Sequence, residues 1–130
     1  MIAFLEVPAL PSGPALLEIL VDDQPAGRTP EDERCHAEWT AGRVQDALTR
    51  RGGAHVLQEV RGAAAFDAAS QQRFARFAAR YGQQIGRLAL VGEPITLRRR
   101  AAILEPLIGG EVRCFDAAQR AAARRWLTAG

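Results

Sequence analysis

The stretch that decides the fold runs from Arg87 to Phe115 and reads RLALVGEPITLRRRAAILEPLIGGEVRCF. It opens with a short apolar run, Arg87–Val91, closed by Gly92, and it ends with a second run of strand type, Glu111–Phe115. Two strands joined by a helix imply a crossover between parallel strands, so we expect a β-α-β unit. The residues that predict the helix share one face and are Leu97, Ala101, Leu104 and Ile108.

Three further runs of strand length precede this unit: Ile2–Val7, Leu16–Val21 and His55–Val60. A proline-rich segment separates the first two, which favours an antiparallel hairpin. Adding the helices gives the order β-β-α-β-α-β-α-β-α. We therefore predict an α/β fold, a single domain over residues 1–130 with a mixed five-stranded sheet whose first strand is antiparallel.

Capping residues define where the helices begin and end. Thr29 and Pro30 predict the start of the first helix, and Gly52 with Gly53 its end. A later helix follows Pro94, and Pro106 should end or kink it, since proline lacks an amide hydrogen. The last helix should begin at a capping box formed by Asp116 and Gln119.

Three motifs carry a family resemblance: RLALVG at residues 87–92, EVRCFD at residues 111–116, and the pair Trp126-Leu127 in an alanine-rich helix. With these motifs the chain resembles the SpoIIAA-like family, relatives of STAS and CRAL-TRIO domains. The resemblance implies a fold related to anti-sigma-factor antagonists, an association with membranes or apolar ligands, and no established reaction.

Antagonists of that wider class carry a phosphorylatable serine in an Asp-Ser pair at a helix start. Here Asp67 is followed by alanine, and Ser70 is the nearest hydroxyl. A phosphate at a helix N-terminus would be well placed electrostatically. The sequence leaves open whether Ser70 is modified.

No pattern of residues predicts catalysis. Cys35 and His36 are neighbours on a helix and point about 100° apart, so they do not form a nucleophile-base pair. Neither Ser12 nor Ser70 lies in a nucleophile elbow, and the chain has no lysine. We predict no enzyme activity, no cofactor and no metal; a small hydrolase or transferase is the last of the alternatives.

Composition limits the partners and the location. The net charge of +2 is small and spread along the chain, which argues against nucleic-acid binding. No apolar run is long enough to span a bilayer, and a cytoplasmic protein, at most membrane-peripheral, is expected. Cys35 and Cys114 are far apart in sequence and should be buried, reduced and metal-free, while Trp126 should be largely buried against the sheet.

The predicted helix from Ala69 to Gln84 carries two adjacent arcs of side chains. One arc is apolar and the other is cationic, and together they could border an apolar ligand and its headgroup or an anionic lipid. A second candidate is an anion site at the turn after the strand, where Gly92 precedes a helix and Arg98 follows. The residues of the first site are Phe74, Phe77 and Tyr81 on the apolar arc and Arg73, Arg76 and Arg80 on the cationic arc.

Two functions follow from these observations. The first is a non-enzymatic SpoIIAA-like domain that regulates a protein partner or binds a ligand. The alternative is a peripheral protein that binds an apolar ligand or makes weak contact with an anionic membrane. A homodimer remains open, and the sequence names neither ligand, partner nor pathway.

Overall fold

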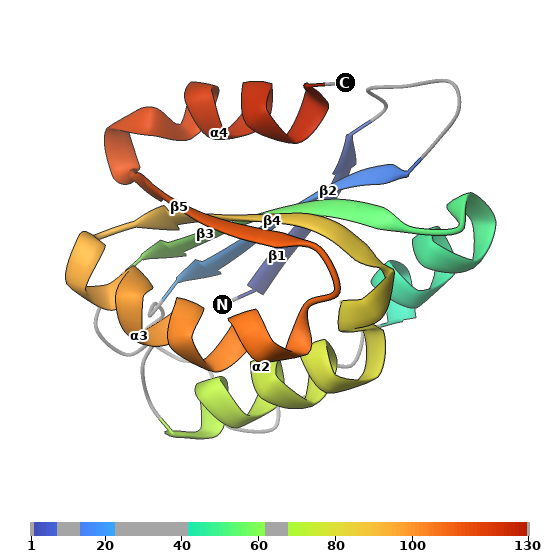
Figure 1. Cartoon of the computed structure of the whole chain (residues 1–130), viewed down its shortest axis with the longest axis horizontal. Helices are drawn as coiled ribbons and strands as arrows, with labels where there is room; N and C mark the ends of the chain where they lie inside the picture. Colours follow the sequence, from blue (N-terminus) through green and yellow to red (C-terminus); the bar gives the residue numbers. More distant parts are fainter. Residues whose placement is uncertain (1, 8–13, 23–41, 62–67, 130) are drawn as a thin grey trace.

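In the computed structural model, residues 2–7, 14–22, 42–61 and 68–129 can be described. They form an α/β fold, which confirms the predicted class (Figure 1). The strands are β1 (Ile2–Val7), β2 (Ala15–Asp22), β3 (Ala54–Arg61), β4 (Ile85–Gly92) and β5 (Glu111–Asp116). The helices are residues 42–51, α2 (Ala68–Tyr81), α3 (Pro94–Leu104) and α4 (Arg120–Thr128), with short 3₁₀ turns η2 (Gly82–Gln84), η3 (Glu105–Leu107) and η4 (Ala117–Gln119).

The strands lie in the sheet in the order in which they occur in the chain, β1-β2-β3-β4-β5. Strands β2 to β5 pair in parallel, so the parallel sheet has four strands. Strand β1 joins its edge antiparallel to β2, with Ile2 opposite Val21 and Val7 opposite Leu16. Strand β5 forms the other edge.

The helix ends show where the sequence interpretation was right and where it was too long. Gly52 ends helix 42–51 with a φ of 77°, and its amide donates to the Leu48 carbonyl at 2.8 Å, the left-handed cap that glycine adopts without steric cost. Helix α3 stops at Leu104 instead of continuing to Ile108, because Pro106 lies in the 3₁₀ turn that follows. Similarly, α2 ends at Tyr81 and η2 replaces the predicted last turn. The predicted start at Thr29 and Pro30 lies outside the described residues.

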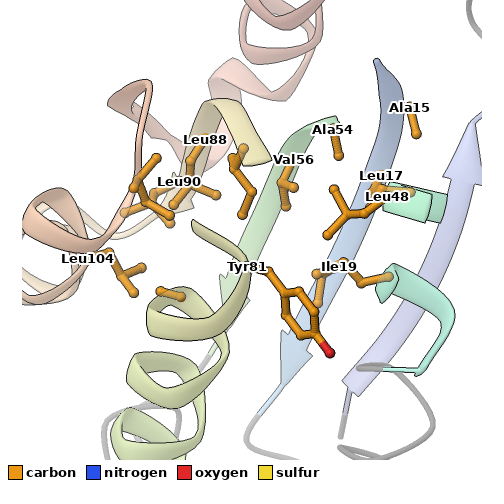
Figure 2. Close-up of a cluster of buried hydrophobic side chains, with 14 of the residues drawn as sticks. Ala15, Leu17, Ile19, Leu48, Ala54, Val56, Tyr81, Leu88, Leu90 and Leu104 are labelled. Atoms are coloured by element: carbon orange, nitrogen blue, oxygen red, sulfur yellow. The ribbon is translucent and has the colours of Figure 1, made fainter. Parts of the chain in front are cut away.

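The larger core lies between one face of the sheet and helix 42–51, α2 and α3 (Figure 1). Alternate residues of the central strands β2, β3 and β4 enter it, as the two-residue period of a strand requires. Leu17, Val56 and Leu90 come from the sheet and meet Leu48, Tyr81 and Leu104 from the helices (Figure 2).

Among the described helices, only α4 covers the opposite face (Figure 1). Its two buried apolar residues, Ala123 and Leu127, pack on a smaller set of sheet residues. Asp116 begins the turn into this helix as predicted: the Ala118 amide donates to its carboxylate at 3.2 Å, and the Asp116 amide donates to Gln119 at 3.0 Å. The sheet residues of this second core are Leu16, Leu57, Ala89, Val91 and Phe115.

Two burial predictions are corrected. Trp126 is half-buried rather than largely buried: it packs against the margin of the smaller core, where its ring centroid lies 5.9 Å from that of Phe115. Cys114 is a free, exposed cysteine, because it lies on the edge strand β5. Partial burial, together with the nearby Glu105 carboxylate, still raises the pKa of its thiol. Cys35 lies outside the described residues.

Candidate functional site

Two of the three aromatic residues predicted to border a ligand, Phe77 and Tyr81, lie in or against the larger core. Tyr81 is buried there, and its hydroxyl donates to Gln45 of helix 42–51 at 3.2 Å (Figure 2). Phe77 is half-buried, and its ring centroid lies 5.1 Å from that of Tyr81. The packing of α2 in the larger core therefore explains the positions of both rings without a ligand. Phe74 belongs to α2, but its side chain is outside what the structure describes.

The arginines of α2 are on the surface. Arg76 and Arg80 are both exposed, and the Arg80 guanidinium lies 5.4 Å from the centre of the Tyr81 ring, a cation-π distance. Neither forms an ion pair with a carboxylate among the described residues, so both remain available to an anionic partner. The side chain of Arg73 lies outside the described residues, as does that of Ser70.

The predicted anion site has a structural explanation for its glycine. Gly92 is buried at the end of β4, where an added Cβ would lie 2.7 Å from the Val60 carbonyl oxygen. The missing side chain therefore allows β3 and the first turn of α3 to pack closely against the backbone of Gly92. Arg98 is exposed on α3, while Glu93 occupies the N-cap and adds a negative charge at the helix start. That carboxylate opposes the binding of an anion there.

The most extensive polar site lies under α4 and consists of Glu18, Glu59, Arg120 and Arg124, here named the carboxylate-arginine cluster. Arg120 donates to Glu18 and to Glu59, each at 2.6 Å, and so bridges β2 and β3. Arg124 donates to the same Oε1 of Glu18 at 2.7 Å. Glu18 is only 4% exposed, whereas both arginines are partly open to solvent. Ion pairs thus attach α4 to two strands.

The arginines of α4 keep the buried Glu18 carboxylate ionised. Burial alone would raise the pKa of Glu18, but the hydrogen bonds from Arg124 and Arg120 outweigh it and hold the pKa below the ordinary value. The hydrogen bond that Arg124 donates to Glu18 also raises the pKa of Arg124. Two buried atoms of the cluster, Oε2 of Glu18 and Nε of Arg120, have no hydrogen-bond partner within the described residues. A carboxylate held ionised by two guanidinium groups is a weak base, so the cluster is suited to holding α4 rather than to proton transfer.

A second buried polar contact lies on the opposite face of the sheet. Arg100 of α3 is 3% exposed and donates to Gln58 of β3 at 2.9 Å. Burial lowers the pKa of Arg100 to about 10, so the guanidinium stays charged at neutral pH. Of the three consecutive arginines in α3, this one faces the sheet, whereas Arg98 and Arg99 face solvent.

Arg87 supports the far end of α4. It donates to the carbonyl oxygens of Trp126 and Ala129, at 2.8 Å and 2.5 Å, and so caps a helix end where positive charge is favourable. The Arg87 guanidinium also lies 5.7 Å from the centre of the Trp126 ring. Burial and the charge of Arg87 lower the pKa of His55.

The sequence interpretation missed the carboxylate-arginine cluster, although a signal was present. Glu18 and Glu59 each interrupt a strand that is otherwise largely apolar, LLEILV and HVLQEV. Arg120 and Arg124 are four residues apart and share one helix face. What the sequence could not supply is which strand lies below which helix, since Arg120 is 102 residues from Glu18 and 61 residues from Glu59.

Comparison with known proteins identifies the family. A SpoIIAA-like family profile matches residues 31–128, so the chain belongs to the SpoIIAA-like family. A crystal structure of an uncharacterised protein with a SpoIIAA-like fold from Shewanella loihica is similar, with a TM-score of 0.60 at 14% identity. The match covers 97% of this chain and 93% of that one, and it shows a shared fold. A search of curated proteins found no significant match.

Two other features bear on the site. None of the helices within the described ranges is both long and apolar enough to cross a membrane. The same residues contain no cluster of three or more histidine, cysteine or acidic side chains arranged to hold a metal ion.

Proposed function

We propose that this chain is a non-enzymatic regulatory domain that acts by binding another protein. The observation that carries the proposal is that the buried charged side chains are hydrogen-bonded to other residues of the chain. Glu18 and Glu59 are hydrogen-bonded to arginines of α4, and Arg100 is hydrogen-bonded to Gln58. These contacts hold the helices on the sheet. Binding to other molecules is therefore assigned to the side chains that face solvent.

The experiment has two parts, both on the full chain. The purified protein is first assayed against p-nitrophenyl acetate and p-nitrophenyl phosphate, and we expect no turnover above buffer. The tagged chain is then cross-linked in its native host, and each recovered protein is purified and titrated against the chain. Direct binding of a recovered protein at micromolar concentration supports the proposal. Turnover that survives repurification, or no protein that rebinds, contradicts it.

A second candidate is weak attachment to an anionic membrane through α2. Arg76 and Arg80 are exposed on one helix, which favours an anionic surface. At about 1 kcal/mol for each basic residue, this pair supplies about 2 kcal/mol, enough for salt-sensitive contact but not for stable anchoring. Binding to a larger apolar ligand would require Phe77 and Tyr81 to leave the core.

Sedimentation with vesicles of phosphatidylcholine and phosphatidylglycerol tests this candidate. Binding at low salt should weaken as salt rises and should be lost in the double variant Arg76→Glu/Arg80→Glu. The variant Arg125→Glu, on the exposed side of α4, is the matched control for the single variant Arg76→Glu, since both change the net charge equally, and it should bind like the parent. If both variants weaken binding equally, the attachment depends on the net charge of the protein and not on α2.

A further inference from the structure

The outer face of α3 carries the most exposed large apolar side chains of the described residues. Ile95 is 67% exposed and Ile103 is 37% exposed. Eight positions separate them, so they lie on the same side of the helix, about 12 Å apart along its axis. Leaving two isoleucines in water forfeits the free energy that burial would give.

Apolar residues therefore lie on both sides of this helix. Its inner side places Leu97, Ala101 and Leu104 in the larger core, next to the buried Arg100. A surface helix normally has a polar outer face, and a helix with apolar residues on opposite sides is normally covered on both. The outer side of α3 has no cover in the described structure, which marks it as an interaction surface.

Charges along the helix indicate what kind of molecule fits. Glu93 lies at the N-terminal end, Arg98 and Arg99 in the middle, and Glu105 just beyond the C-terminal end, all exposed. The order of signs is negative, positive, negative. The isoleucines lie between the central arginines and the two acidic ends.

A second copy of the chain fits this pattern badly. If two α3 helices paired antiparallel, Glu93 of each would face Glu105 of the other, and the central arginines would face each other. Parallel pairing about a two-fold axis would also place like charges together. Like charges directly opposite are unfavourable, so a symmetric dimer through this face is disfavoured.

An anionic membrane also matches the charge pattern along α3 poorly. The two exposed arginines of α3 are offset by Glu93 and Glu105 at its two ends, which leaves no net charge along this face to attract anionic lipid. A protein segment with acidic residues between two apolar contacts matches both the signs and the spacing. Anchors about two helical turns apart are typical of helix-against-helix recognition.

We infer that the outer face of α3 binds a partner protein through an acidic segment whose apolar side chains cover Ile95 and Ile103 and whose carboxylates pair with Arg98 and Arg99. This inference rests on the proposed function and adds the surface and the chemistry of the partner. Arginine is well suited to such a contact, because its guanidinium can pair with a carboxylate through two hydrogen bonds.

The test places the photoreactive residue benzoylphenylalanine at position 95, and separately at position 125 on α4, in the full chain expressed in its native host. Ultraviolet light should link position 95 to a protein, and mass spectrometry should map the link to a segment rich in aspartate and glutamate. The purified partner should then bind the double variant Arg98→Glu/Arg99→Glu at least tenfold more weakly than the parent. Acidic-to-lysine changes in the mapped segment should restore that binding.

The outcomes separate the surface from the proposed function. Links from position 125 but not from position 95 would leave a binding domain that uses α4 and would overturn the inference about α3. Links from position 95 to a second copy or to lipid would overturn it as well. No link from either position, with no protein recovered by general cross-linking, would overturn both. Because Arg98 and Arg99 are exposed, an unchanged circular dichroism melting curve is the control for folding.

Discussion

The two faces of the sheet are covered in different ways. On one face, helix 42–51, α2 and α3 together bury a continuous apolar core, with Gln58 and Arg100 as a buried polar contact. On the other face, the described part of the chain places one helix of nine residues, α4, which buries Ala123 and Leu127 and relies on Arg120 and Arg124 to reach β2 and β3. The same strands therefore supply an apolar surface on one side and acceptors for ion pairs on the other.

The difference has a physical cause. A short helix offers few apolar side chains, and an isolated helix of this length is marginal in water, so α4 depends on its tertiary contacts. Hydrogen-bonded ion pairs at one end and the Arg87 cap at the other hold it over the small core. We therefore expect apolar substitutions to affect the larger core most and charge substitutions to act on α4.

Truncation of a leucine should have the largest effect, and a matched pair compares the faces. Leu90 lies in the larger core and Leu127 in the smaller core, both almost fully buried. Leu90→Ala should lower the free energy of unfolding by about 3 to 5 kcal/mol and Leu127→Ala by about 2 to 3 kcal/mol, because the surroundings of a terminal helix can relax into the cavity. Urea denaturation at neutral pH measures both. A larger cost for Leu127→Ala would show that α4 is no weaker than the other helices.

Trp126→Ala should cost less than a fully buried tryptophan would. The side chain is half-buried, and its contacts are the Phe115 ring and the guanidinium groups of Arg87 and Arg113, which lie 5.7 Å and 6.0 Å from the centre of its ring. We expect a loss of about 2 kcal/mol, below the range of about 3 to 5 kcal/mol for complete burial. Thermal unfolding by circular dichroism is the measurement, with Trp126→Phe as the control that keeps an aromatic ring. A loss above 4 kcal/mol would mean that the ring is a central part of the core.

Disrupting the carboxylate-arginine cluster should have the next largest effect on the free energy of unfolding. Glu18→Ala removes the acceptor shared by Arg120 and Arg124 and should cost about 1 to 2 kcal/mol, less than for a fully buried pair because both arginines can turn to solvent. Asp46→Ala is the matched control: Asp46 pairs with Arg50 at 3.1 Å, both are well exposed, and the cost should stay below about 0.5 kcal/mol. Equal costs for the two variants would remove the distinction between this cluster and a surface ion pair.

Acid should weaken the same cluster. Because the pKa of Glu18 is lower in the folded chain than the ordinary 4.5, the unfolded chain takes up the proton first. The stabilisation is complete above that ordinary value and is lost as the pH falls through the folded pKa. Glu18→Gln cannot take up this proton, so the gap between parent and variant should narrow below about pH 4.5. A gap that stays constant from pH 7 to pH 3 would contradict the assignment.

Much of this architecture could be predicted from the sequence, since it depends on local patterns. The RLALVG and EVRCFD motifs, the glycines after Arg51 and the Asp116 capping box fix strands and helix ends through neighbouring residues. Which side chains are buried near the edges of the fold was harder to predict. Cys114 is exposed because β5 has no outer neighbour, and the aromatic rings of α2 could be placed on an arc but not assigned to core or surface until the packing of helix 42–51 was known.

The smallest expected effect concerns His55, near the other end of α4, where Arg87 caps the helix. Burial and the charge of Arg87 lower its pKa below 6.5, so the folded chain favours the neutral ring while the unfolded chain takes up a proton. Stability is therefore complete above pH 6.5 and falls as the pH drops through the folded pKa, a window above that of Glu18. The half-buried ring makes this loss smaller than that at Glu18. A pH series of urea midpoints for the parent and His55→Asn should show the difference between them narrowing from pH 8 to pH 5.5. The difference between the parent and Glu18→Gln should stay constant over that range, because both keep His55. A difference that widens over this interval would mean that the folded chain binds the proton more tightly, and the lowered pKa would be wrong.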